Sequence, residues 1–201
     1  MSSATTTEVH DFRLGLGHPV LELLATRARR YDEPLERLAE PADLTRWLEL
    51  SRLADGARCS RDTLADAHEL REAIYRTLTA ARESRRPDRR DLRLLNDWAR
   101  QPTPSPQLDG SLKAVLTGPD PSRAALAALA RAAIELIAGP GLSRIRNCAN
   151  PGCSLMFIDH SRPGRRRWCS MERCGNRAKT ARYRQQRRRE RARGGTALDH
   201  R

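Results

Sequence analysis

The chain has 201 residues, of which 38% are hydrophobic and 31% are charged. This length permits one or two domains with a sizeable core, and no run approaches the roughly 18 consecutive apolar residues of a membrane span. The sequence therefore predicts a soluble, intracellular protein and excludes a membrane-spanning one. Its 38 Lys and Arg against 25 Asp and Glu give a formal net charge of +13.

The excess charge is confined to the C-terminal part of the chain. Residues 144–201 hold 17 Arg or Lys and 4 acidic residues, a net of +13, whereas residues 1–143 hold 21 of each. Charge gathered in one segment is typical of proteins that bind polyanions. A solvated, arginine-coated helix and a disordered basic tail are the alternative interpretations. A membrane surface is disfavoured as the partner, because residues 175–193 carry no broad apolar face.

Apolar residues recur with helical spacing through the front half, which predicts a mainly α domain. The first helix begins at Pro19, a residue that suits a first helical turn, and its predicted stripe extends from Val20 to Arg27. Three more helices are expected from Ala42 to about Leu53, from Arg61 to Arg85 after a Ser60 cap, and from Asp88 or Arg90 to Ala99.

A short β-hairpin and a last helix complete the predicted front domain. The dipeptide Asp109-Gly110 lies between two apolar runs within residues 107–116, which is a hairpin signal. Residues 123–138 are the most apolar helical segment, and we expect them at the centre of the domain. The sequence Gly139-Pro140-Gly141 ends this helix, so the domain boundary is expected at about residue 142.

Four of the five cysteines predict one metal site. Cys148 and Cys153 form one pair and Cys169 and Cys174 the other, each with four intervening residues, and 15 residues separate the pairs. Structural zinc sites use two such pairs of thiolate ligands. Two disulfides, or cysteines buried as small apolar residues, are the alternatives. Because residues 1–10 lack the apolar segment of a secretory signal, we expect a reducing cytoplasm, which favours one structural Zn²⁺ per chain.

Short extended pieces replace the helical pattern around these cysteines. They are residues 144–148, 155–158 and 166–168, and an arginine-rich helix candidate follows them. A knuckle, a small hairpin and a helix that supplies the last ligand describe a treble-clef-like zinc finger. The expected organisation is a mainly helical domain over residues 1–142, a zinc finger with a basic helix over residues 143–193, and a disordered tail over residues 194–201.

This C-terminal region resembles the CGNR zinc finger. The matching residues are Arg146-Asn147-Cys148, Cys153, Phe157-Ile158-Asp159, Arg166 to Met171, Cys174-Gly175-Asn176-Arg177, Lys179 and Tyr183-Arg184. In bacterial proteins this finger typically follows an alanine-rich ABATE domain, in a family described as stress-induced transcription regulators. The resemblance implies duplex-DNA binding by the finger, and sensing of a small-molecule effector by the front domain.

The basic residues of the finger and its helix are the candidate nucleic-acid contacts. They are Arg165, Arg166, Arg167, Arg177, Lys179, Arg182, Arg184, Arg187, Arg188 and Arg191. An α-helix fits the major groove of duplex DNA, but most arginines contact phosphates, which position a protein without reading sequence. Phe157 and Trp168 are expected to form a small core over the zinc. A homodimer is compatible with the small DNA footprint of one finger, although no heptad pattern supports it.

The leading hypothesis from the sequence is a zinc-dependent, DNA-binding transcriptional regulator. An RNA-binding or ribosome-associated zinc module is the first alternative, because arginine-rich helices also bind RNA. An enzyme in the front domain is the second alternative. Against it, the sequence lacks a P-loop, a dinucleotide fingerprint, a paired-His metal motif and a nucleophile elbow. We therefore expect no catalytic residues.

Overall fold

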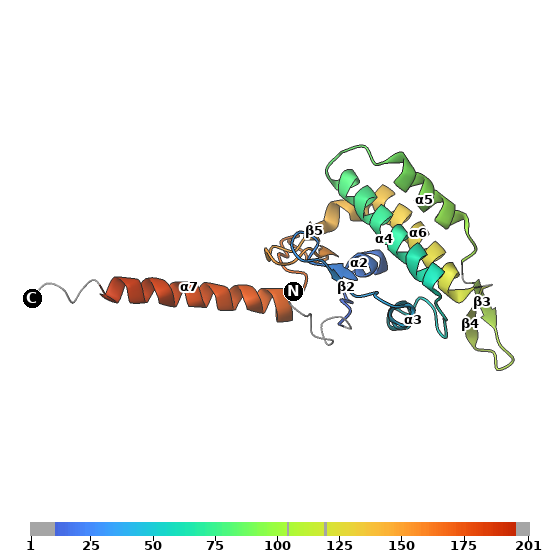
Figure 1. Cartoon of the computed structure of the whole chain (residues 1–201), viewed down its shortest axis with the longest axis horizontal. Helices are drawn as coiled ribbons and strands as arrows, with labels where there is room; N and C mark the ends of the chain where they lie inside the picture. The colour runs from blue at the N-terminus through green and yellow to red at the C-terminus, as the bar shows by residue number, and fades with distance from the viewer. Residues whose placement is uncertain (1–10, 104, 119, 196–201) are drawn as a thin grey trace, which may run out of the picture.

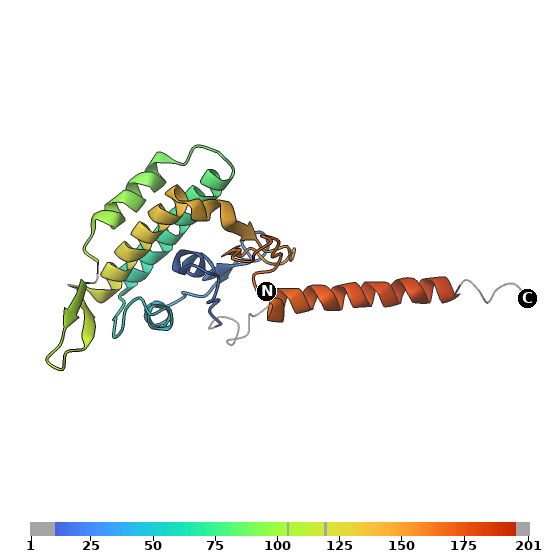
Figure 2. The same ribbon diagram turned by 180° about the vertical axis from the view of Figure 1, so that it is seen from behind.

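The computed structural model describes residues 11–103, 105–118 and 120–195, which form a helical body with one projecting helix (Figure 1). Helices α4 (Arg61–Arg82), α5 (Arg89–Arg100) and α6 (Pro121–Ala138) pack side by side. Helices α2 (Pro19–Leu24) and α3 (Pro41–Leu50) lie against α4 and α6. The last helix, α7 (Asn176–Gly195), extends away from the body, as the view from behind also shows (Figure 2).

The predicted helices are present, with ends that differ by a few residues: α3 ends at Leu50 rather than about Leu53, α4 ends at Arg82 rather than Arg85, and α6 begins at Pro121 rather than residue 123. Polar side chains cap the starts of α4, α5 and α6. Ser60 accepts a hydrogen bond from the backbone N–H of Thr63 at the start of α4, and Asp88 and Asp120 do the same for α5 and α6. Prolines occupy the first turn of α2, α3 and α6, where a backbone N–H is not needed. None of the described helices is both long and apolar enough to cross a membrane.

The first helix is shorter than its apolar pattern predicts. The helix α2 ends at Leu24, and Arg27 belongs instead to strand β1 (Arg27–Ala28), which pairs antiparallel with β2 (Leu35–Glu36). The physical reason is local, because the Thr26 hydroxyl donates a 2.6 Å hydrogen bond to the Leu23 carbonyl and closes the last turn. The hairpin that follows contacts both parts of the chain, because Glu36 in β2 bonds to Arg71 of α4 and Arg30 in the loop between the strands bonds to Ser154 of the finger.

Two further antiparallel hairpins complete the described β-structure, and two short helical turns, η1 (Pro140–Arg144) and η2 (Met171–Gly175), lie on either side of the cysteine-rich loops. Strands β3 (Ser105–Leu108) and β4 (Ala114–Thr117) form the predicted hairpin, whose turn is held by Asp109 accepting N–H bonds from Ser111 and Lys113. It projects from the end of the body opposite to α7 (Figure 1). Strands β5 (Ile145–Asn147) and β6 (Met156–Ile158) pair within the finger. The fold is therefore mainly α, with small two-stranded sheets.

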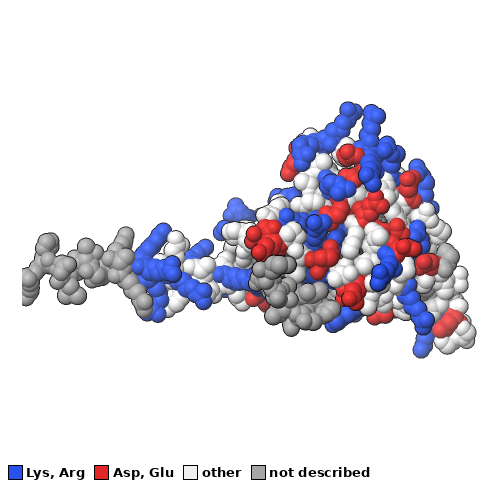
Figure 3. All heavy atoms as spheres, viewed as in Figure 1, with Lys and Arg blue, Asp and Glu red and all other residues white. Residues whose placement is uncertain are grey.

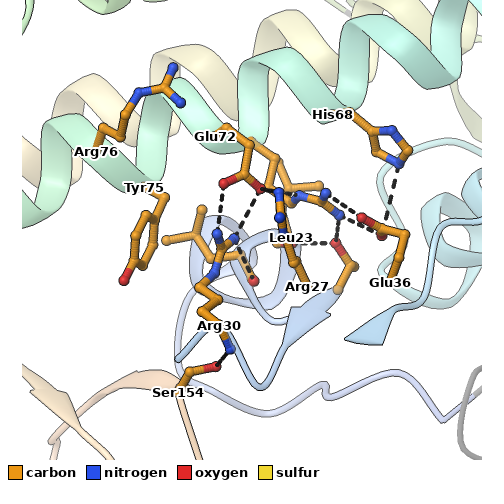
Figure 4. A network of polar contacts seen from close by, with 12 residues as sticks. Leu23, Arg27, Arg30, Glu36, His68, Glu72, Tyr75, Arg76 and Ser154 are labelled. Carbon is orange, nitrogen blue, oxygen red and sulfur yellow. Dashed lines mark hydrogen bonds and ion pairs between the residues drawn. The ribbon is translucent and has the colours of Figure 1, made fainter. Parts of the chain in front are cut away.

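The helix α4 buries an arginine together with its apolar face. Leu64, Ala67, Leu70, Ile74 and Leu78 are buried, and Arg71 beside them is only 1% exposed. The Arg71 guanidinium donates to both Glu36 carboxylate oxygens at 2.7 and 2.5 Å and to Glu72 at 3.0 Å (Figure 4). Burial alone would raise the pKa of the Glu36 carboxyl, but its hydrogen bonds and charge pairing with Arg71 outweigh burial and lower this pKa. The network fastens the β1–β2 sheet to α4.

The same network reaches the finger through Arg30. The Arg30 side chain donates to Glu72 at 2.7 Å, while its backbone N–H donates to the Ser154 hydroxyl at 3.1 Å (Figure 4). A second link joins α4 to the finger, because Arg82 donates to the Asn147 side chain at 2.9 Å. The backbone N–H of Ile158 also donates to the Leu16 carbonyl at 2.9 Å. The finger is therefore packed on the helical body, and the two share one continuous apolar core.

Replacing the buried arginine tests the strength of this junction. We expect Arg71→Met to lower the free energy of unfolding by about 2 kcal/mol, because it leaves partly buried carboxylates without their partner. This is below the cost for a fully buried pair, since the Glu36 and Glu72 side chains are 33% and 21% exposed. Urea unfolding in the presence of zinc measures the change. The control Arg100→Met, which breaks a pair with exposed side chains, should change stability by less than about 1 kcal/mol, and equal losses would contradict the interpretation.

Candidate metal centre and nucleic-acid interface

The structure brings the four predicted ligands together. The Sγ atoms of Cys148, Cys153, Cys169 and Cys174 all lie within 4.8 Å of one another. The Cys153–Cys169 and Cys169–Cys174 sulfur separations are 3.8 and 3.6 Å. A tetrahedral zinc with Zn–S bonds of about 2.3 Å requires sulfur atoms about 3.8 Å apart. The four thiols therefore fit one structural zinc, and no disulfide joins any of the five cysteines.

Tight turns and one backbone bridge assemble this cluster. The backbone N–H of Cys153 donates to the Asn150 carbonyl at 2.9 Å, which folds the first knuckle so that Cys148 and Cys153 face one point. The backbone N–H of Ala149 donates to the Arg167 carbonyl at 2.8 Å and brings the second knuckle beside the first. Cys174 lies in the short turn η2 (Met171–Gly175), directly before α7. The metal ligands therefore fix where α7 begins.

The four thiols cannot all ionise easily without a cation. Hydrogen bonds from the Cys153 and Cys169 thiols lower the pKa of Cys148, with further help from backbone N–H groups. The hydrogen bonds to Cys148 hold the protons on Cys153 and Cys169 and so raise the pKa of these two thiols. Burial raises the pKa of the Cys174 thiol. One negative charge is favoured and further charges are opposed. A divalent zinc would offset this repulsion, so the chemistry of the donor set also fits zinc.

Asp159 organises the long loop between the two cysteine pairs, a role that the sequence did not reveal. The residue is 3% exposed, and its carboxylate accepts hydrogen bonds from Ser161 and from the backbone N–H of Arg166 at 2.9 Å. These hydrogen bonds lower the pKa of the Asp159 carboxyl, with the Ser161 hydroxyl as the largest cause. The only sequence signal was that Asp159 belongs to the motif. Because it closes the loop, Asp159 positions the segment that leads to Cys169.

The aromatic residues of the finger form the small core that was expected. Phe157 is fully buried, and Trp168 is half-buried against the same cluster. The Arg166 guanidinium lies 4.6 Å from the Phe157 ring centre and donates to the carbonyls of Trp168 and Cys169. The Arg167 guanidinium lies 5.1 Å from the Trp168 ring centre. All three predicted contacts, Arg165 to Arg167, are exposed, and Arg166 in addition forms contacts within the finger itself.

The helix α7 carries most of the other predicted nucleic-acid contacts. The side chains of Arg177, Lys179, Arg182, Arg184, Arg187 and Arg188 are exposed. The space-filling view shows basic residues along this projecting helix (Figure 3). The side chain of Arg191 lies outside the described residues, as do residues 196–201 of the predicted tail, and α7 itself continues to Gly195. The described part of α7 therefore presents a solvent-exposed basic surface.

The start of α7 is held close to the metal cluster. A Cβ atom added to Gly175 would lie 2.8 Å from the Met171 sulfur, so a larger residue there would displace the end of the exposed Met171 side chain. The Asn176 side chain donates to the Glu172 carbonyl at 2.9 Å. Asn176 is the first residue of α7, and this hydrogen bond links it to the turn η2. The direction of α7 is consequently set by the finger.

Comparison with known protein families assigns both parts of the chain. The family model described as "ABATE: Putative stress-induced transcription regulator" matches residues 17–140, and the model of the CGNR zinc finger matches residues 144–188. No curated protein sequence matches the chain. The two matches confirm the architecture that the motif resemblance indicated. The second match contains all four clustered cysteines, which supports one structural zinc.

Removing one ligand tests the metal centre. We expect Cys169→Ala to abolish stoichiometric zinc binding and to lower the thermal midpoint of the whole protein, because Cys169 is 6% exposed within the core that the finger shares with the body. Metal content by mass spectrometry and thermal unfolding measure the two effects. The matched variant Cys59→Ala, which changes the cysteine outside the cluster, should retain one zinc per chain. A Cys169→Ala protein with full zinc content and an unchanged midpoint would refute a four-cysteine structural site.

Proposed function

The chain belongs to the ABATE family, whose description is "Putative stress-induced transcription regulator", and it carries a CGNR zinc finger; on this premise we propose that it regulates transcription by binding duplex DNA through α7. Neither matched domain is an enzymatic type. A zinc site closed by four cysteine ligands has no open position for substrate, so its role is structural. The finger would then act in regulation by binding another molecule and not by catalysis.

The single observation that carries this proposal is the exposed, uncovered basic helix. The 20 residues of α7 include nine Arg or Lys and one acidic residue, Glu190. Such a helix is about 30 Å long, and its largest apolar side chain, Tyr183, is 59% exposed. A helix that is polar on every side gains little from packing within its own chain. A polyanion supplies the complementary charge.

Duplex DNA suits the geometry of α7 as well as its charge. Its major groove is wide enough to admit an α-helix, and arginine can donate two hydrogen bonds to guanine. The exposed Arg184 and Arg188 are four residues apart and therefore lie on one face of α7. Like charges at this spacing repel one another in the free helix. Phosphate contacts would relieve the repulsion, so we expect DNA to stabilise α7 as well as to bind it.

We further propose that the helical body controls the finger. A small-molecule effector of residues 1–142 would act only by binding DNA-competent and DNA-incompetent arrangements with different affinities. The hydrogen bonds Arg30–Ser154 and Arg82–Asn147 connect the body to the finger and support such control. A homodimer would double the DNA footprint of a single small finger. A regulator of this kind would act in the cytoplasm of a bacterial cell, where the DNA lies.

Neutralising one face of α7 tests the proposed function. We expect the double variant Arg184→Gln and Arg188→Gln to weaken duplex-DNA binding and to reduce the slope of log K against log salt by up to about 1.8, or about 0.9 for each phosphate contact. Fluorescence anisotropy over a salt series measures both quantities. The zinc content should not change, because neither residue touches the cysteine cluster.

A control and a competition complete this test. The variant Arg52→Gln removes an exposed charge after α3, away from α7, and should bind DNA like the unaltered protein. In a competition experiment, double-stranded and single-stranded RNA would be added to the protein bound to labelled duplex DNA. The experiment compares the affinity for DNA with the affinity for RNA, which arginine-rich helices can also bind. A zinc-loaded protein that binds no duplex DNA at low salt would overturn the proposal. Preferential binding of RNA would show that α7 is an RNA-binding helix and would contradict the proposed binding of DNA.

A further inference from the structure

The helical body carries its own basic surface, although residues 1–143 have no net charge. Residues 84–93 contain five arginines and two aspartates. We name these arginines the α4–α5 corner, because they lie in the connection between α4 and α5 and in the first turns of α5. Its members are Arg85, Arg86, Arg89, Arg90 and Arg93, and all are exposed. In the space-filling view, blue basic side chains gather at the top of the body, where Figure 1 draws the connection between α4 and α5 (Figure 3).

The acidic residues of this segment are already engaged, which leaves part of the corner unneutralised. Asp88 caps α5 by accepting the backbone N–H of Arg90 at 2.6 Å. Asp91 is 4% exposed and pairs with Arg76 at 2.6 Å. Glu83 pairs with Arg85, and Glu69 pairs with Arg90. Within the described part of the chain, no carboxylate forms an ion pair with Arg86, Arg89 or Arg93.

The corner lies next to the finger that directs α7. The last turn of α4 provides Arg82, which hydrogen bonds to Asn147 immediately before the zinc ligand Cys148. The connection to α5 begins directly after Arg82. Two further exposed arginines, Arg144 and Arg146, lie at the start of the finger. Figure 1 shows the α4–α5 connection and the finger at the end of the body from which α7 projects. Basic side chains therefore occur from the corner, through the finger, to α7.

From this arrangement we propose that the α4–α5 corner is a second nucleic-acid contact surface, which binds the phosphate backbone of the same duplex that α7 engages. The corner is charged and exposed, and arginine contacts to phosphates add affinity and orientation without reading bases. It would bind backbone that flanks the groove occupied by α7. The inference rests on the proposed function, because it assigns the body a direct share in DNA binding beyond its effect on the finger.

Charge removal at opposite ends of α4 tests this inference. The test variant is Arg86→Gln with Arg89→Gln, and the matched control is Arg58→Gln with Arg61→Gln. All four side chains are exposed, and the control pair lies at the other end of the 22-residue helix α4. We expect the test variant to reduce the salt slope of duplex-DNA binding by about 1.8 and to weaken binding by more than about tenfold at low salt. The control variant should keep the salt slope and the affinity of the unaltered protein.

The outcomes separate this inference from the proposed function. If the unaltered protein binds DNA, and the test variant shows the same slope and affinity as its control, the second surface is refuted while the role of α7 stands. If the unaltered protein binds no duplex DNA, both proposals are overturned. Thermal unfolding and zinc content of each variant check the fold. The reversal Arg86→Glu, which should weaken binding further than Arg86→Gln, distinguishes a charge effect from a local structural one.

Discussion

The binding of one zinc ion by four cysteine thiolates is the interaction on which the C-terminal part of the structure depends. The finger is short and has few large apolar residues, so apolar burial alone gives it little stability. Zinc binding contributes roughly 10–16 kcal/mol in small finger peptides. Cys174 lies one residue before Gly175, which adjoins α7. The same ligand set therefore stabilises the finger and determines where the basic helix leaves it.

The position of the finger also depends on its contacts with the helical body. Ser154, which follows the ligand Cys153, accepts a hydrogen bond from Arg30, and Arg30 pairs with Glu72 of the central helix α4. Asp11, at the start of the described chain, also pairs with Arg173 in the turn before α7. These contacts place charged groups of the body against the zinc finger. A displacement of α4 or of the β1–β2 sheet would change these contacts at the finger. Because the finger holds the start of α7, such a displacement would also change the position of α7.

Much of this arrangement could be predicted from local sequence, because periodicity, caps and cysteine spacing are local signals. Ser60 marked the start of α4, Asp109-Gly110 marked the hairpin, and the two cysteine pairs indicated the zinc site. Long-range contacts have no such signal. The burial of Arg71 depends on Glu36, 35 residues earlier, and the Arg30–Ser154 bond spans 124 residues. The early end of α2 also escaped prediction, since Thr26 closes the helix through its own hydroxyl rather than through a proline or glycine.

The most direct test of the account is reversible zinc removal during duplex-DNA binding by the full chain. Anisotropy of a labelled duplex would be recorded with the zinc-loaded protein, after chelator, and after zinc is restored. The account predicts one zinc per chain, loss of salt-dependent binding with the metal, and recovery on its return, because zinc fixes the finger that holds α7. Metal-free protein that binds the duplex with unchanged affinity and salt slope would contradict it, since α7 would then act without the zinc-held finger.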